Sequence, residues 1–363
     1  MKTLNWYVTR GFLGAFFMAI AVLTFGMTGA RLVQVLEYVS QGISFFTFIK
    51  FTLYILPIVL TFTVPWAVMV AVMLVFGRLS ADNEITAMRA CGVSILQITS
   101  PILIITIALS ALCLYLQVEL GPPLLGQSRD MMKIEVINQP MAMFEPGKSA
   151  TLDNYLVYVD DKDGNNGLRG IELYILSGAN EWEQNISADY GKVVVDKKKQ
   201  IMAIKLSDCL VTDKSKSDDG FDRFFTKELE LMYHYGKAEN EKRVSVRPKY
   251  MRLSDLMGRI RLTKELNKDT TELEIELNQR IAFALSPIAF LLLGLPLAIR
   301  TSRRETSVGL FLSVILAGVF FLSIILCESL ESFPYLYPQY LLWLPNIIFQ
   351  IIGAVMTYRI SQK

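Results

Sequence analysis

The sequence has 363 residues, of which 52% are hydrophobic and 19% charged, and its mean hydropathy is +0.39. This composition is typical of a membrane protein and excludes the ordinary soluble globular class. The formal net charge of +2 gives no general basic surface, so nucleic acid is not an expected partner.

Two basic residues, Lys2 and Arg10, precede an apolar run at residues 11–30. This run is too long for a signal peptide and has no small-x-small cleavage site before Arg31. The pattern therefore predicts an uncleaved first membrane span whose N-terminus is cytoplasmic.

A polar segment at residues 77–94, GRLSADNEITAMRACGVS, separates two further predicted spans. Ser80 is a suitable helix N-cap, and Gly92 can adopt the left-handed conformation that ends a helix. The segment therefore predicts an amphipathic helix of about three turns at residues 78–92. The flanking spans are predicted at residues 51–76 and 95–118.

This predicted helix has two different sides. At helical spacing Ile85 and Met88 share an apolar face, Asp82 and Arg89 follow a neighbouring polar flank, and Glu84 stands at the opposite edge. Such a helix between spans is suited to lie on the bilayer surface or to dock into the groove of a soluble partner. An ordinary surface connector is the alternative.

The middle of the chain, residues 121–252, is predicted to be a soluble all-β domain inserted between two membrane blocks. Gly121-Pro122-Pro123 is expected to close the first block. Short alternating stretches bounded by turn residues predict an antiparallel sandwich or a jellyroll-like sheet stack. The strand candidates are residues 154–160, 168–176, 192–196, 200–206 and 221–235, of which the third and fourth form a hairpin around a lysine turn.

Residues 253–363 are predicted to form a helical connector and three more spans, at 281–299, 307–327 and 340–358. The chain is thus an α-helical integral membrane protein of six spans in two groups of three, with residues 1–120 as the first group. Basic residues concentrate in the loops on the side of both termini, which places the termini and the loops at 77–94 and 300–304 in the cytoplasm. The β-domain then lies outside, which in a bacterium is the periplasm.

The sequence contains no motif for an energy source or for catalysis. The fragment Gly-Lys-Ser at 147–149 lacks the earlier glycine of a phosphate-binding loop, because that position is Ala142. The single histidine, His234, has no carboxylate or thiol cluster around it, and the four cysteines show no obvious pairing. The spans hold almost no ionisable side chains, which argues against an ion-driven carrier. We therefore expect a passive membrane subunit that is driven through the segment at 77–94.

The chain resembles the LptF/LptG permeases, the paired membrane subunits of the ABC exporter that extracts lipopolysaccharide from the inner membrane of Gram-negative bacteria. The most specific stretch is the segment at 77–94, which is similar to the family's coupling helix. The Gly121-Pro122 step, the stretch QPMAMFEPGKS and the stretch ELNQRIAFALSPIAFLLLGLPLAI also match. The sequences of the coupling helix and of the ELNQRI stretch resemble the F-type subunit more than the G-type.

The resemblance implies a non-catalytic permease with a periplasmic β-jellyroll, without a cofactor of its own because ATP is bound by a partner chain. It implies a sister permease, a dimer of a cytoplasmic ABC ATPase, periplasmic bridge proteins and lipopolysaccharide as partners. Glu84 matches the acidic position that contacts the ATPase, with Asp82 and Arg89 as flanking polar anchors.

A lipid with phosphates in the outer leaflet needs cations at the outer rim of an apolar cavity. Arg31, at the outer end of the first span, matches a position where the family places a basic residue, and Lys50 is a second candidate. Snorkelling to the membrane interface is the alternative for both, evenly balanced for Arg31 and favoured for Lys50. The outer end of the fifth span departs from the F-type pattern, because it carries Glu328 and Glu331 where that pattern often has a lysine.

Three other functions stay open at this point. The chain could be the G-type subunit or an exporter of another lipid. It could be a scaffold that presents the β-domain without transport, in which case no ATPase would bind. A membrane enzyme is the remaining class, but its only candidates, Glu328 and Glu331, lack a partner base or metal ligand.

Overall fold

The computed structural model describes most of the chain, and the described residues divide into two compact units. The first unit comprises Met1–Leu32, Thr52–Ser128 and Arg247–Lys363, and the second comprises Val33–Phe51 and Arg129–Val246. The chain therefore builds the first unit from both of its ends. The described residues are 2–40, 45–138, 144, 146–152, 155–163, 167–176, 182–196, 201–214, 221–234, 247–301, 306–330 and 333–362.

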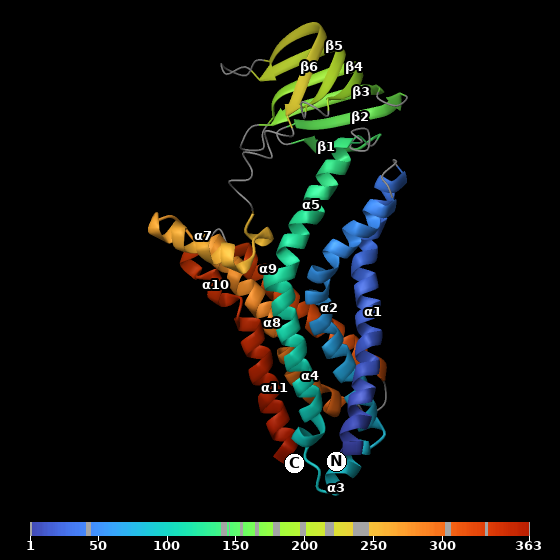
Figure 1. Ribbon diagram of the computed structural model, residues 1–363, viewed down its shortest axis with the longest axis vertical. Helices are drawn as coiled ribbons and strands as arrows, with labels where there is room; N and C mark the ends of the chain where they lie inside the picture. The colour runs from blue at the N-terminus through green and yellow to red at the C-terminus, as the bar shows by residue number, and fades with distance from the viewer. Residues whose placement is uncertain are drawn as a thin grey trace. The chain divides into compact units, whose positions relative to one another are not determined.

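The first unit is a bundle of long helices (Figure 1). Among the described residues, 6 helical stretches are long and apolar enough to cross a membrane, which confirms the predicted number of spans. They are Lys2–Gly29, Phe46–Ala81, Ile95–Met131, Thr271–Arg300, Gly309–Ser329 and Pro338–Ile360. The elements that contain them or join them are α1 (Lys2–Ser40), α2 (Phe45–Ala81), α3 (Glu84–Ala90), α4 (Ile95–Tyr115), η1 (Leu116–Leu120), α5 (Gly121–Asn138), η3 (Pro248–Tyr250), α7 (Leu253–Glu265), α8 (Thr271–Thr301), α9 (Thr306–Ser329), η5 (Pro334–Leu336), α10 (Pro338–Leu341) and α11 (Leu344–Gln362).

Helices α2 and α8 form the interior of this bundle. In each of them 72% of the most apolar stretch is buried, against 17% in α1 and 22% in α9. Met69 of α2 and Phe290 of α8 are fully buried, and so is Phe320 of α9, whose ring packs on that of Phe290. The outer helices expose apolar side chains over most of their length, as expected where lipid or another membrane helix covers them.

Prolines inside the spans leave carbonyl groups without their helical partners, and at Pro101 and Pro287 the preceding serine replaces the missing donor. Pro287 cannot donate to Phe283, and the hydroxyl of Ser286 donates to that carbonyl at 2.6 Å. Pro101 likewise cannot donate to the carbonyl of Gln97, which accepts from the Ser100 hydroxyl at 3.1 Å. Each Ser-Pro step thus supplies the donor that its own proline removes, so the helix continues through the membrane.

The third span does not end at Gly121-Pro122-Pro123, where the sequence analysis placed the close of the first block. The helix widens into one π turn, η1, in which the amide of Gly121 donates to the carbonyl of Leu116, and then continues as α5. The wider turn accommodates the prolines, which have no amide hydrogens of their own. Position 121 needs glycine, because a Cβ there would lie 2.7 Å from the Leu116 oxygen.

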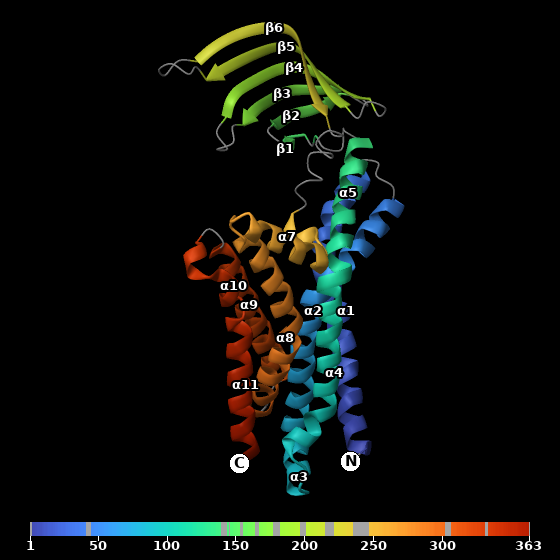
Figure 2. The ribbon, with the colours of Figure 1, turned by 60° about the vertical axis from the view of Figure 1, so that its left-hand side comes forward.

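The second unit contains an antiparallel sheet of six strands in sequence order, which confirms the inserted all-β domain. Figure 2 shows that the sheet is strongly curved. The described strands form one sheet, so a stack of two sheets does not apply to them. The strands are β1 (Ser149–Leu152), β2 (Tyr155–Asp163), β3 (Gly167–Leu176), β4 (Trp182–Asp196), β5 (Ile201–Lys214) and β6 (Phe221–His234).

The strand predictions hold in part: β1, the first ten residues of β4 and the last eight residues of β5 were missed. The predicted hairpin is present, with Val193 opposite Ile204, and its lysine turn lies outside the described residues. In β2, Val157 and Val159 are fully buried on one face with Phe144 and residues of the next four strands. The strand that ends at His234 pairs this residue with Ile201. All four cysteines are free thiols.

Candidate functional site

The polar segment between the second and third spans forms a shorter helix than predicted. Helix α2 continues to Ala81, and α3 has only 7 residues. Ser80 is therefore not an N-cap: it lies in α2, and its hydroxyl donates to the carbonyl of Ile299 near the end of α8 at 2.9 Å. Asn83 makes the turn instead, with φ of 56°, a conformation that asparagine tolerates better than most residues. The bond from Ser80 ties the loop to the interior helix α8.

The C-terminal end of α3 is built as predicted. Gly92 has φ of +82°, the conformation that favours glycine. Its amide donates to the carbonyl of Arg89 at 2.9 Å, and the amide of Val93 donates to that of Met88 at 3.1 Å, which is the Schellman pattern. Helix α4 then begins with a reciprocal cap between Ser94 and Gln97. The C-terminal end of α3 and the start of α4 are thus fixed by local hydrogen bonds.

The apolar side of α3 faces the chain's own interior. Ile85 is 5% exposed and belongs to the main core, and half-buried Met88 packs against the same core. Asp82 and Thr86 are exposed. The two large apolar residues of α3 therefore face the chain's own core. The residues left for a partner are the exposed Asp82, Thr86 and Ala87 and the half-buried Glu84 and Arg89.

Glu84 lies at the start of α3 and is linked to the first helix. The hydroxyl of Tyr7 in α1 donates to its carboxylate at 3.3 Å. Arg89 is half-buried in the last turn of the same helix. Sequence reasoning missed Tyr7, because a contact between residues 77 positions apart leaves no local pattern.

Both ends of the described chain and α3 lie at one end of the helix bundle (Figures 1 and 2). Three helices end there with a basic residue in the last turn, where a cation suits the helix dipole. These residues are Arg78, Arg300 and Arg359. The loop at 302–305, with the rest of the predicted basic cluster, lies outside the described residues.

The two candidates for lipid phosphate, Arg31 and Lys50, belong to different units. Arg31 belongs to the first unit and its side chain lies outside the described residues, whereas Lys50 belongs to the second unit. The Lys50 ammonium lies 4.7 Å from the centre of the Phe46 ring, one turn away on the same helix. This contact fits the snorkelling alternative for Lys50.

The structure adds a buried cation that the sequence analysis did not single out. Arg280, in the ELNQRI stretch, is 3% exposed and donates to three acceptors. These are the Glu276 carboxylate at 2.8 Å, the Met251 carbonyl at 2.7 Å and the Pro248 carbonyl at 3.0 Å. The planar guanidinium thus fixes the segment at 248–251 against α8, which a lysine could not do at three places.

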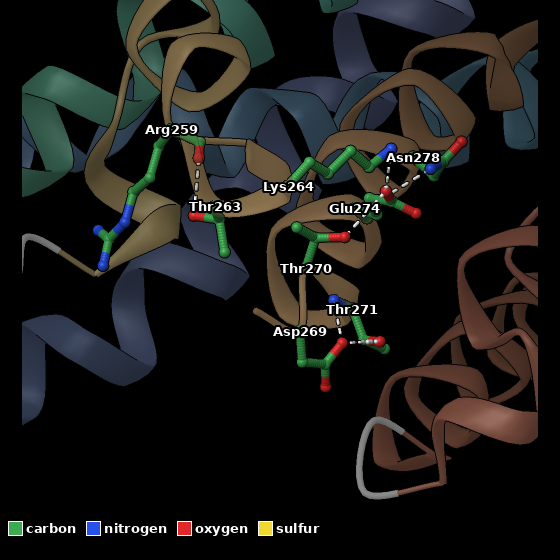
Figure 3. Close-up of polar contacts among 8 residues, drawn as sticks. All are labelled: Arg259, Thr263, Lys264, Asp269, Thr270, Thr271, Glu274 and Asn278. Carbon is green, nitrogen blue, oxygen red and sulfur yellow. Dashed lines mark hydrogen bonds and ion pairs between the residues drawn. The ribbon is translucent and has the colours of Figure 1, made fainter. Parts of the chain in front are cut away.

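A second polar network fixes the turn between α7 and α8 (Figure 3). The Glu274 carboxylate accepts from Lys264 at 2.8 Å and from Thr270 at 3.1 Å, and the Lys264 contact raises the pKa of that ammonium. Asp269 accepts from the hydroxyl and the amide of Thr271, and these two bonds lower the pKa of its carboxyl group. The network therefore holds α7 at a defined position on the end of α8.

Of the two acidic residues at the end of α9, the structure describes Glu328, which takes part in a hydrogen bond within the chain. Glu328 accepts a hydrogen bond from Gln279 at 3.2 Å, and Glu331 lies outside the described residues. In the described part of the chain no three His, Cys, Asp or Glu residues are grouped as a metal ion would require. The site with the clearest partner geometry is thus the α3 loop.

A comparison with protein families gives a match that covers the chain almost from end to end. The family described as "Lipopolysaccharide export system permease LptF/LptG" matches residues 6–359, nearly the whole chain. No curated protein matches the sequence.

Proposed function

The chain belongs to the LptF/LptG family of lipopolysaccharide export permeases, and we propose that it is the F-type permease subunit of an ABC exporter in the bacterial inner membrane. In this proposal a separate cytoplasmic ATPase dimer drives it, a sister permease completes the membrane pore, and the β-domain passes lipopolysaccharide to periplasmic bridge proteins. The termini and α3 face the cytoplasm, in line with the positions of the basic residues.

The observation that carries the proposal is the construction of the α3 loop. Asp82 and Thr86 are exposed, whereas Ile85 on the other side of α3 is buried in the main core, which includes residues of α2 and α8. A load applied to the polar side would be transmitted directly to the two interior helices, because packed cores deform little. The bond from Ser80 to Ile299 adds a second link to α8.

Within this loop we assign Glu84 as the anion that a cation of the ATPase binds, with Asp82 and Arg89 as flanking contacts. Ile85 and Met88 anchor the helix from behind. At the other end of the bundle, Arg31 remains the first candidate for a lipid phosphate and Lys50 the second.

The test is a gentle-detergent purification of the chain from its native membranes, in which the eluate is assayed for an ATPase and a sister permease. Glu84→Arg reverses the charge at the proposed contact, and Glu272→Arg is the matched control, an exposed glutamate in the first turn of α8. We expect both partners with the wild type and the control, and loss of the ATPase alone with Glu84→Arg. A chain that elutes without any ATPase supports the scaffold instead.

A further inference from the structure

The segment at residues 247–268 is far more basic than the rest of the chain. It holds seven basic and two acidic residues, a net charge of +5, whereas the entire chain carries only +2. The basic residues are Arg247, Lys249, Arg252, Arg259, Arg261, Lys264 and Lys268, and the acidic ones are Asp255 and Glu265. Lys264 is paired with Glu274 within the chain, and the concentration of basic residues around it attracts anionic partners.

Helix α7 carries three of these seven basic residues, Arg259, Arg261 and Lys264, and the other four flank it. The helix lies at the end of the bundle opposite α3. The last turns of α8 are bonded to Ser80 beside the α3 loop, so the first turn of α8 is at the other end. There Asn278 accepts from Trp343 at 3.0 Å, and Gln279 donates to Glu328, which places the end of α9 and the start of α11 alongside. Figure 2 shows α7 lying across this end of the bundle.

Helix α7 is amphipathic, but it exposes apolar side chains as well. Leu256 is fully buried and Ile260 is 9% exposed, and both pack with Leu273 of α8. Leu262 and Leu266, one turn apart and on the other side of the helix, are 61% and 66% exposed. Two leucines facing water beside a row of cations would be unfavourable, whereas the boundary between headgroups and acyl chains suits both.

The neighbouring connection between α9 and α11 also exposes residue types that are typical of the membrane interface. Four aromatic side chains there are between 46% and 71% exposed. They are Phe333, Tyr335, Tyr337 and Tyr340. Tyrosine is enriched where membrane meets water, because its ring is apolar and its hydroxyl is polar. These residues mark the level of the membrane surface at this end of the bundle.

We propose that α7 lies in the headgroup layer of the membrane, with Leu262 and Leu266 inserted towards the acyl chains and with Arg261 and Lys268 bound to anionic lipid phosphates. In the topology proposed above this is the outer leaflet of the inner membrane. The positive-inside rule concerns basic residues in cytoplasmic loops, so it does not explain the basic residues of this outer segment. The inference depends on the six spans and not on lipopolysaccharide export.

The depth of α7 is measured with nitroxide labels at Leu262→Cys and Leu266→Cys in nanodiscs of phosphatidylglycerol and phosphatidylcholine, after the exposed Cys91 and half-buried Cys327 are replaced. Collisions with oxygen report on lipid, and collisions with a water-soluble nickel chelate report on water. Leu322→Cys, exposed on α9, is the lipid reference, and Lys227→Cys in β6 is the water reference.

We expect both α7 labels to behave like the label at position 322, with frequent oxygen and rare nickel collisions. Frequent nickel collisions at 262 and 266 would place α7 in water and overturn the proposal. Rare collisions of both kinds would mean that protein covers this face, which equally overturns it.

The cations are tested separately by counting phosphatidylglycerol molecules retained by the purified chain in native mass spectrometry. Arg261→Gln with Lys268→Gln should weaken binding about fivefold for each cation removed. Lys192→Gln with Lys227→Gln removes the same charge from exposed sites of the β-domain and should leave retention unchanged. Equal retention by the two double variants would contradict the role of α7.

Discussion

Gly353 of α11 lies directly against the backbone of Leu292 in α8, closer than any Cβ at position 353 would allow. The carbonyl of Leu292 is the one that Pro296 leaves without its helical donor. The two helices therefore meet where α8 is weakened by a proline, and the glycine lets α11 support the backbone at that point. Close approach of this kind is a common use of glycine between membrane helices.

Gly353→Leu should destabilise the bundle, because the two backbones would have to separate. Overpacking of this kind typically removes about 1–3 kcal/mol from the free energy of unfolding. Thermal unfolding of the purified chain in detergent measures it. Gly318→Leu in α9 is the control, because a Cβ there meets nothing within 4 Å. Equal unfolding midpoints for the two variants would show that the two helices can separate without a loss of stability.

Arg280→Met should release the segment at 248–251 from α8. The substitution removes the donor to two backbone carbonyls and the partner of Glu276. Breaking a buried ion pair costs about 3–5 kcal/mol of the free energy of unfolding. The cost is lower here, because the Glu276 side chain is partly exposed. Limited proteolysis within residues 247–252 and the unfolding midpoint report the change. Arg280→Lys should recover little, because one ammonium cannot reach all three acceptors.

Arg261→Lys is the matched control for Arg280→Lys, since it makes the same exchange at an exposed position on α7. We expect it to leave both measurements at the wild-type value. If Arg280→Lys also behaves like the wild type, charge alone holds the segment and the three-acceptor geometry does not matter.

The spans and most strands could be predicted from the sequence, because hydropathy and alternation are local properties of the chain. The turn at Gly92 could be predicted for the same reason. The start of α3 could not: Ser80 is a good N-cap by composition, but its hydroxyl is used by Ile299. The choice between an N-cap and a bond to Ile299 depends on the packing of α2 against α8, and the two residues are 219 positions apart in the sequence.

The same distinction applies to the helix through Gly121-Pro122-Pro123 and to the two side chains that sequence reasoning missed. Two prolines ordinarily end a helix, and the π turn that prevents this is not visible in residue types. Arg280 looks like one more interfacial cation until its acceptors at Met251 and Pro248 are seen. Tyr7 acquires a role only through its contact with Glu84.

Tyr7→Phe should weaken binding of the proposed ATPase without unfolding the chain. The hydroxyl holds the Glu84 carboxylate, and a hydrogen bond at an exposed site contributes at the low end of about 0.5–1.5 kcal/mol, or about a twofold loss of affinity. Titration of the purified ATPase against the chain in nanodiscs measures it. Tyr358→Phe removes a hydroxyl near the end of α11 and should not change the affinity. A Tyr7→Phe affinity equal to that of Tyr358→Phe would remove Tyr7 from the contact.

Stability should fall in acid through Asp269, whose carboxyl group has a pKa below its ordinary value of 3.8 because it accepts two hydrogen bonds from Thr271. A carboxyl group with a lowered pKa stabilises the folded state above the unfolded-state pKa, and this contribution is lost as the pH falls through the lower, folded-state value. Asp269→Asn keeps an acceptor oxygen but cannot ionise, so it should be less stable than the wild type at pH 6. The difference should shrink as the pH falls below about 4, as measured by thermal unfolding across this range. A difference that stays constant with pH would assign the effect to hydrogen-bond geometry rather than to charge.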